Sequence, residues 1–502
     1  MHRFLLLLSL LLFVPLNQLF SQDYHARVID AQTKKPVPYA NVVFGEHKGV
    51  VTNEEGFFSF NFVQQKPESV QISSLGYEPV EIAIDSLQNL VISLSPSTIE
   101  LKEVFVSNKN LSPLEIIKKV KEEISNNFDL GLGQKRIFFR ESSFNNIKKF
   151  KLKVEESTIE GIDQNLMNRL TEEMPKFTDS YREVLGDLYG NYDKQKLHIV
   201  KAANLYDPKE SQSVEQIVHQ METLFRDNLK KKSFLKIKSG WLGVKVDADE
   251  LEKGMADLEN EKKEKTPEEK AEYKAKNKIF LQKSTATNIN SLLANVFWKE
   301  NIPFNLFEKT RKYEFNLKGY LHLDDEVVYV IEFQPKRKAD YKGTIYVNSL
   351  DYGVHRLEYE NVRPLKHFRL LGVSKTDDVY RGKMIFTRNE SGKYSISYLE
   401  QEKGQTVGID RPLTIIEKNR HVPGRNKQNE LDMDLDLLLG VVTKVQMLIY
   451  DDKSITESDY EILPAEDTFE YQAFNSYNPD FWKGNNIIEP NEAIKQFTAM
   501  ED

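Results

Sequence analysis

The sequence predicts a mainly β protein with helices, in which a small N-terminal β-sandwich precedes a larger α+β domain built on a curved antiparallel sheet. Residues 23–96 alternate six short β-rich runs with turn residues, at a spacing of about a dozen residues. From residue 312 onward, long alternating runs return and dominate the chain. The intervening residues 165–300 have a mostly helical or irregular pattern, which predicts that the second domain contains helices as well as strands.

The first residues have the pattern of a secretory signal peptide. Arg3 supplies a positive start, residues 4–14 are almost entirely apolar, and residues 15–21 form a more polar exit segment. The apolar run is shorter than the roughly 20 residues that a membrane-spanning helix needs. We therefore expect export and cleavage near Ser21 and Gln22, with an uncleaved anchor as the alternative.

Composition excludes several classes of function. The chain has a net charge of −8 and no cysteine, which excludes disulfides, cysteine chemistry and a lipid-modified N-terminal cysteine. A nucleic-acid partner is not expected, because binding phosphates requires a basic face. No later run is apolar for long enough to cross a membrane as a helix. We expect an exported protein of the periplasm, outer membrane or cell surface, with peripheral association with the outer membrane as one form of attachment.

Changes in pattern divide the chain into five segments. They are a signal peptide at 1–21, a β-sandwich at 22–98, a linker at 99–111, a helix-rich α+β region at 112–310 with a charged insertion at 247–278, and an antiparallel, half-barrel-like sheet with a C-terminal tail at 311–502. Ser112, Pro113 and Glu115 predict a helix start with a capping box. Residues 259–278 are mostly Lys and Glu, so we expect a solvated helix or loop there, with a partner contact as the alternative.

Four motifs follow one another in the predicted sandwich. They are Val28-Ile29-Asp30, Pro36-Val37-Pro38-Tyr39-Ala40-Asn41-Val42, Gly49-Val50-Val51-Thr52-Asn53 with Gly56-Phe57-Phe58, and Ser74-Leu75-Gly76-Tyr77. Together they resemble the carboxypeptidase-regulatory-like domain of Gram-negative bacteria. The resemblance implies a transthyretin-like β-sandwich that acts as an accessory module, since the peptidase of such proteins is a separate domain. Residues 99–106 are similar to the hinge that joins this domain to the plug of outer-membrane transporters.

The strings at 328–335, 343–347 and 351–357 resemble exported lipoprotein-carrier-like half-barrels. In the carrier family such a sheet curls round a helix, and its concave apolar face holds acyl chains. A sheet that only packs helices gives the same alternation, so both interpretations stay open. We expect the C-terminal tail to dock on this sheet, where Trp482 either anchors a core or lines a site.

No catalytic, cofactor-binding or metal-binding residue is assigned from the sequence. The nine histidines include no pair within one helical turn, and His355 and His367, the closest pair, are interpreted as non-ligands. No Gly-x-Ser-x-Gly elbow occurs, and Gly131-Leu132-Gly133 lacks the other residues of a P-loop, so we interpret it as a turn. The sequence therefore predicts no cofactor and no enzyme activity.

Acidic clusters do not change this prediction. Pairs such as Asp324-Asp325 and Asp377-Asp378 are expected by chance in a chain with 77 acidic residues. Asp432-Met433-Asp434-Leu435-Asp436 has the spacing of calcium-loop acids but lacks the Gly and closing Glu of an EF-hand. We expect a non-catalytic envelope protein that docks or binds a partner protein or an apolar ligand. The alternatives are a glycan or peptide hydrolase with unidentified paired carboxylates, and a purely structural surface protein.

Overall fold

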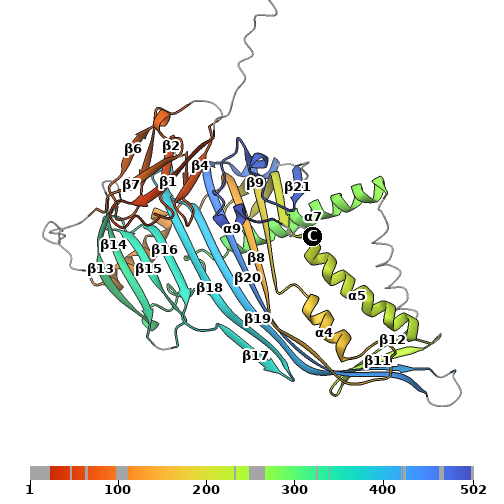
Figure 1. Cartoon of the computed structure of the whole chain (residues 1–502). Helices are drawn as coiled ribbons and strands as arrows, with labels where there is room; N and C mark the ends of the chain where they lie inside the picture. Colours follow the sequence, from red (N-terminus) through yellow and green to blue (C-terminus); the bar gives the residue numbers. More distant parts are fainter. Residues whose placement is uncertain are drawn as a thin grey trace, which may run out of the picture.

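A computed structural model describes the chain from residue 23 to residue 498 with several gaps. The described residues are 23–45, 48–62, 66–97, 111–230, 233–247, 266–323, 326–336, 338–419, 421, 426–462 and 469–498. They form a small sandwich set against one long curved sheet with helices, which confirms the predicted fold class (Figure 1). The predicted signal peptide, residues 99–110 of the predicted linker, residues 248–265 of the charged insertion and Asp324-Asp325 lie outside the described residues.

The sandwich consists of two small sheets. The first has the order β4 (Phe57–Phe60), β1 (Tyr24–Asp30), β7 (Leu90–Leu94), and the second has the order β3 (Lys48–Val51), β2 (Asn41–Gly45), β5 (Ser69–Ser73), β6 (Val80–Ala83). Alternate side chains of β1, including Tyr24, Ala26 and Val28, are buried between the sheets. This period of two is the pattern from which the sandwich was predicted.

The large sheet contains fourteen strands in the described part of the chain. Its main order is β13 (Tyr313–Leu323), β14 (Glu326–Pro335), β15 (Tyr341–Asn348), β16 (Val354–Asn361), β18 (Val373–Arg388), β19 (Tyr394–Lys418), β20 (Lys427–Ser454), β8 (Gly133–Ser157), β9 (Phe177–Gly190), β10 (Gln195–Tyr206), β21 (Glu470–Phe474). Off this path lie β11 (Phe234–Ser239), β12 (Leu242–Asp247) and β17 (Lys366–Leu370). Because β8, β9 and β10 pair in the same sheet as the later strands, the expected boundary at 310/311 does not separate two domains.

Two segments of the predicted helix-rich region are strands instead. Residues 177–190 and 195–206 form β9 and β10. From Val184 to Leu188, every residue of β9 is buried, because both faces of the sheet are covered there. A strand buried on both faces loses the alternation that predicts strands, which is why the sequence pattern was misleading.

The helices lie on the sheet or at its ends. They are α2 (Pro113–Glu122), α3 (Ile124–Asn127), α4 (Gln164–Glu173), α5 (Pro208–Asn228), α7 (Pro267–Leu293), α8 (Glu457–Ile462) and α9 (Glu492–Lys495), with short 3-10 turns at Ile84–Ser86, Thr310–Lys312 and Pro479–Trp482. The capping box predicted at Ser112 and Glu115 is present at the start of α2. Within the described residues, no helix is both long enough and apolar enough to cross a membrane.

The centre of the large sheet is covered on both faces. On one face, α2, α7 and residues 296–307 form an apolar core that includes Phe297 and Phe304. On the other face lie the sandwich and the C-terminal tail. The tail docks on the sheet as expected, and Trp482 anchors this core: its ring packs on Phe138 and its indole N–H donates to Glu183 at 2.6 Å.

Beyond the covered centre, the longest strands continue into an arm. The arm consists of the distal parts of β8, β18, β19 and β20 with β11, β12 and β17, as Figure 1 shows. Helices α4 and α5 pack on one face near its far end, against residues that include Leu431 and Met433. The remaining surface of the arm is not covered by the sandwich or by the central helices, so one sheet has a closed centre and an open arm.

Candidate functional site

Two rows of polar side chains cross the sheet on the face that carries the sandwich. The first row pairs Glu332, Thr344, Glu358, Lys383, Glu400 and Gln446 across successive strands. The second row pairs Lys342, Glu360, Arg381, Glu402 and Lys444. Directly paired residues share a face, so the charges of one row are neighbours. Intervening residues such as Ile331 and Leu399 point into the opposite core.

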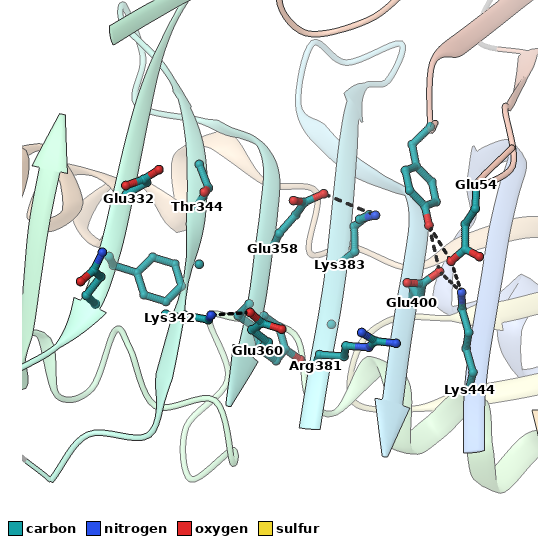
Figure 2. Close-up of a pocket in the computed structure, with 16 residues that line it drawn as sticks. Glu54, Glu332, Lys342, Thr344, Glu358, Glu360, Arg381, Lys383, Glu400 and Lys444 are labelled. Atoms are coloured by element: carbon teal, nitrogen blue, oxygen red, sulfur yellow. Dashed lines mark hydrogen bonds and ion pairs between the residues drawn. The ribbon is translucent and has the colours of Figure 1, made fainter. Parts of the chain in front are cut away.

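All side chains of the two rows except Glu402 and Gln446 line a pocket of about 500 Å³ between the sheet and the sandwich. The sandwich contributes Tyr39 and Glu54, while the rest of the lining comes from β14, β15, β16, β18, β19 and β20. Figure 2 shows Glu332 and Lys342 at one end, Glu358 and Glu360 in the middle, and Glu54, Glu400 and Lys444 at the other end. Most of the lining is polar, so the pocket suits a ligand that carries charges.

The inner end of the pocket joins the two domains. The Tyr39 hydroxyl lies 3.2 Å from a carboxylate oxygen of Glu54 and 3.3 Å from one of Glu400. The Lys444 ammonium lies 3.2 Å from Glu400 and also bonds to Glu54, and the Lys383 ammonium lies 3.3 Å from the centre of the Tyr39 ring. A cation against an aromatic face is attractive. Tyr39 thus holds the sandwich onto a charged part of the sheet.

Tyr39 adopts a backbone conformation that is unusual for its residue type. Its φ is 59°, in the left-handed region that glycine and asparagine favour. Thr52 fixes this loop, because its amide donates to the carbonyl of Ala40 and its carbonyl accepts from the Tyr39 amide, each at 3.0 Å. Strained residues persist where the surrounding structure holds them. In this conformation the Tyr39 ring packs against Tyr398 of the sheet, with ring centres 5.3 Å apart.

The partly buried carboxylates Glu358 and Glu400 of the pocket are ionised. Burial alone would raise the pKa of Glu400, but Lys444 and Lys383 outweigh burial and hold that pKa below its ordinary value. The pKa of Glu358 is lowered in the same way, since Arg356 and Lys383 overcome the effect of burial. Each acid therefore keeps its negative charge at neutral pH, and each is matched by cations.

The two lysines at the joint respond differently to this environment. Burial lowers the pKa of Lys383 below its ordinary value, even though Glu358 and Glu400 oppose the change. For Lys444 the order is reversed, because Glu400 and Glu54 outweigh burial and raise the pKa. Lys444 therefore stays protonated and links Glu54 of the sandwich to Glu400 of the sheet. Lys383 lies between two carboxylates and under an aromatic ring.

His355 and His367, the closest pair of histidines in the sequence, lie on different strands of the sheet. His355 is buried on β16, and its Nε2 lies 3.0 Å from a carboxylate oxygen of Glu326. His367 lies on the exposed strand β17, where Nδ1 is 2.9 Å from the Thr376 hydroxyl. Gly131 lies in a turn where its amide donates to the Asp129 carboxylate at 3.0 Å, in agreement with its interpretation as a turn.

The acidic run at 432–436 lies within strand β20 and not in a loop. Asp434 and Asp436 pair across the strands with Lys153 and Lys151 of β8, and Asp436 forms an ion pair with Lys149. Asp377 and Asp378 lie on β18. Among the described residues, no group of three or more His, Cys, Asp or Glu side chains is arranged to hold a metal ion. The calcium-like spacing therefore reflects one face of a strand.

The residues that line the pocket were not predicted from the sequence. A signal was present: the neighbouring strands carry charges two residues apart, as in Glu358 with Glu360, Arg381 with Lys383, and Glu400 with Glu402. Charges at this spacing lie on one face of a strand. Their convergence depends on strand pairing, which a single sequence does not give.

Comparisons with known proteins cover the two parts of the chain unequally. Residues 25–106 match the family model of the CarboxypepD_reg-like domain. The sandwich is such a domain. This domain type is regulatory and non-catalytic, as the sequence motifs implied. Tyr39 and Glu54, the two side chains that the sandwich contributes to the pocket, therefore belong to the CarboxypepD_reg-like domain.

No curated protein matches the sequence. Among solved structures, the chain is similar to a crystal structure of a domain named for outer membrane lipoprotein sorting, from Vibrio parahaemolyticus. The identity is 9%, the TM-score is 0.20, and the alignment covers 70% of this chain and 97% of that chain. A TM-score of this size carries no argument about fold or function, so the half-barrel resemblance stays a prediction.

Proposed function

We propose that this protein is a non-catalytic binding protein of the bacterial envelope, in which the sandwich and the sheet together form a pocket for a charged segment of a partner protein. The observation that carries the proposal is the pocket itself, because both domains contribute charged side chains to it. The signal-peptide pattern and the regulatory domain type support an accessory role in the envelope.

Charge states in the pocket favour binding over hydrolysis. A hydrolase with two carboxylates needs one carboxyl group that keeps its proton near neutral pH. Neighbouring cations lower the pKa values of Glu358 and Glu400 instead, so both remain ionised. Lys383 lies between these two acids in the row and forms a 3.4 Å ion pair with Glu358. Fixed, paired charges of this kind recognise a partner by electrostatic complementarity.

Packing on the opposite face favours a polar partner over an acyl chain at the centre of the sheet. Phe304 stacks on Tyr359 with ring centres 4.0 Å apart, and Phe297 packs against Phe128 and Phe386. These buried rings fill the space between the sheet and the helices. An apolar ligand would have to displace this core, whereas the charged pocket is already open.

The outer part of the pocket indicates what the partner segment presents. Lys342 pairs with Glu360 at 2.9 Å, Arg381 pairs with Glu402 at 2.7 Å, and Glu332 lies in the next row. Side chains of both signs therefore alternate along the open floor at the spacing of strands, about 5 Å. A partner segment with alternating charges fits this pattern, and its binding weakens as salt rises.

Site-specific photo-crosslinking tests the proposal. A photoreactive amino acid replaces Thr344 inside the pocket, and in a matched control it replaces Thr287, an exposed residue of α7. In the source bacterium we expect one partner to crosslink at Thr344 and not at Thr287. The crosslink should disappear when Lys342→Glu and Arg381→Glu are introduced together. A crosslink that persists through this double reversal, or equal crosslinking at both positions, would contradict the proposal.

A further inference from the structure

The contact between the sandwich and the sheet leaves a second cavity, separate from the charged pocket. Its volume is about 360 Å³, and it shares no lining residue with the charged pocket. Strands β2, β3 and β5 of the sandwich supply its roof, and the ends of β18, β19 and β20 supply most of its floor. We call this cavity the second pocket. Its size suits a small molecule.

Apolar side chains line the middle of the second pocket from both domains. Val42 and Phe44 belong to the core of the sandwich, so Val43 between them points outward, towards the sheet. Leu448 and Tyr450 of β20 lie on the face of the sheet that carries the sandwich, and both line the pocket. Val43 remains 39% exposed although the two domains are in contact. Space for an apolar group is therefore left between roof and floor.

Two uncharged polar side chains of the roof face the second pocket without a partner. Asn41 of β2 pairs with Ser73 of β5, so their side chains are neighbours on one face, while the next pair, Val42 and Ile72, points into the core of the sandwich. Ser73 is only 5% exposed. Within the described part of the chain, neither side chain forms a hydrogen bond. Because buried polar groups normally have a partner, these two indicate a polar group of a ligand.

The carboxylates that line the second pocket are already matched by cations of the protein. The pairs are Glu326 with Arg388 at 3.0 Å, Asp451 with Lys453 at 3.8 Å, and Asp452 with Lys135. Glu326 also lies 3.0 Å from the Nε2 atom of His355. A cationic ligand would have to compete with one of these resident cations. The second pocket therefore does not favour a cation.

Lys48, by contrast, lines the second pocket with an unmatched charge. It is exposed at the start of β3 and forms no hydrogen bond or ion pair among the described residues. Arg388, the other Lys or Arg of the lining, is engaged by both Glu326 and Asp351. Ammonium groups form their stronger hydrogen bonds with carboxylates. An anionic group at the mouth of the pocket would reach Lys48 without displacing any ion pair.

We propose that the second pocket binds a small carboxylic acid with an apolar body and a hydroxyl group at its far end. The carboxylate pairs with Lys48, the body lies against Val43, and the hydroxyl bonds to Asn41 and Ser73. Asn41 pairs with Val51, three residues from Lys48 on β3, so about 10 Å separates the two polar contacts along the strand. The proposal does not depend on the function proposed for the charged pocket.

Isothermal titration calorimetry of the exported protein tests the proposal with matched probes. 8-Hydroxyoctanoate carries both polar groups, octanoate lacks the hydroxyl, 1,8-octanediol lacks the charge, and octylamine reverses it. We expect 8-hydroxyoctanoate to bind most tightly and octylamine not to bind. Lys48→Gln should weaken the binding of 8-hydroxyoctanoate about threefold and leave that of octanediol unchanged, because an exposed ion pair contributes modestly. Val43→Phe fills the cavity and should abolish the binding of every probe.

Two control variants separate the second pocket from the rest of the sandwich. Lys35→Gln and Val91→Phe change exposed residues outside the pocket and should leave binding unchanged, and melting curves verify that every variant is folded. The proposal is overturned if 8-hydroxyoctanoate does not bind, or if octanoate or octylamine binds as tightly. It is equally overturned if folded Val43→Phe binds as well as the native chain, since the ligand would then lie elsewhere.

Discussion

The centre of the large sheet and its arm share strands but differ in what covers them. In β19, Tyr398 and Leu399 point to opposite faces, and both are buried, one under the sandwich and one under the helices. Further along the same strand, Asp410 is exposed and Ile409 is only half-buried. Burial on both faces makes the centre the stable part of the molecule, whereas the arm retains surface for contacts.

The largest expected difference between the two regions concerns buried aromatic rings. Phe304→Ala should lower the free energy of unfolding by about 3–5 kcal/mol, because a fully buried ring leaves a cavity. Phe368→Ala on the arm should change it by less than about 0.5 kcal/mol, since that ring is half-exposed. Chemical denaturation of both variants measures the contrast. Equal losses would mean that the arm is packed as tightly as the centre.

Breaking a buried ion pair at the centre of the sheet should also lower stability more than breaking an exposed ion pair on the arm. The difference should be smaller than for the aromatic rings. Arg140 is buried, with Nε 2.7 Å from Glu183 and a second bond of 2.7 Å to the carbonyl of Ile488 in the tail. Arg140→Ala leaves a buried carboxylate without its cation and should cost about 3 kcal/mol. Lys149→Ala removes the partner of Asp436 on the solvent-exposed arm and should cost less than about 1 kcal/mol. Urea titrations of the two variants would show no difference if the sheet were uniformly solvated.

Removing a charge at the contact between the sandwich and the sheet should lower stability by an amount between those of the buried and the exposed ion pair. Glu400→Gln keeps the shape of the side chain but removes the charge that faces Lys444 and Lys383. We expect a loss of about 1–3 kcal/mol and faster proteolytic release of the sandwich, because the partly buried Lys444 and Lys383 each lose one of two neighbouring carboxylates. Glu402→Gln, one position along the same face, is a matched control with a smaller expected effect. Identical proteolysis of both variants would argue against a joint held by charge.

The smallest effect is a dependence on acidic pH. The His355 ring, whose Nε2 lies 3.0 Å from the carboxylate, and then Arg388 lower the pKa of Glu326 from its ordinary 4.5 to about 2. A carboxyl group with a depressed pKa stabilises the fold above its unfolded pKa and loses that contribution as pH falls towards its folded pKa. Stability should therefore fall between about pH 4.5 and 2. Glu326→Gln should flatten this part of the pH profile of thermal unfolding, and an unchanged profile would show that other carboxylates determine it.

Sequence patterns predicted the parts of the fold that are buried on one face. The sandwich strands alternate, as in Tyr24, Ala26 and Val28, and the helix after Ser112 carries a recognisable cap. Strands β9 and β10 were missed because the centre of the sheet is covered on both sides. The continuity of the sheet was missed because it rests on pairing between distant residues such as Leu437 and Phe150. No local pattern encodes such a pair.

The candidate site was even harder to predict from the sequence than the fold, because it also depends on pairing between distant residues. Tyr39 was visible in a family motif, but its φ of 59° and its position over the sheet depend on the loop around Thr52. The charges at 358, 383 and 400 are ordinary in a chain in which 29% of residues are charged. They become a site because strand register places them side by side. Register is set by the whole sheet and not by any one strand.

Hydrogen exchange of the exported protein, measured with increasing denaturant, tests the central claim that the sandwich and the centre of the sheet form one unit joined by Tyr39, Glu400 and Lys444. We expect amides of β1 and of the first half of β19 to open with the same free energy, while amides of β17 and β12 exchange much faster. A sandwich that opens at a much lower free energy than β19 would contradict the account. The CarboxypepD_reg-like domain would then be a loosely attached module, and the pocket would not be preformed.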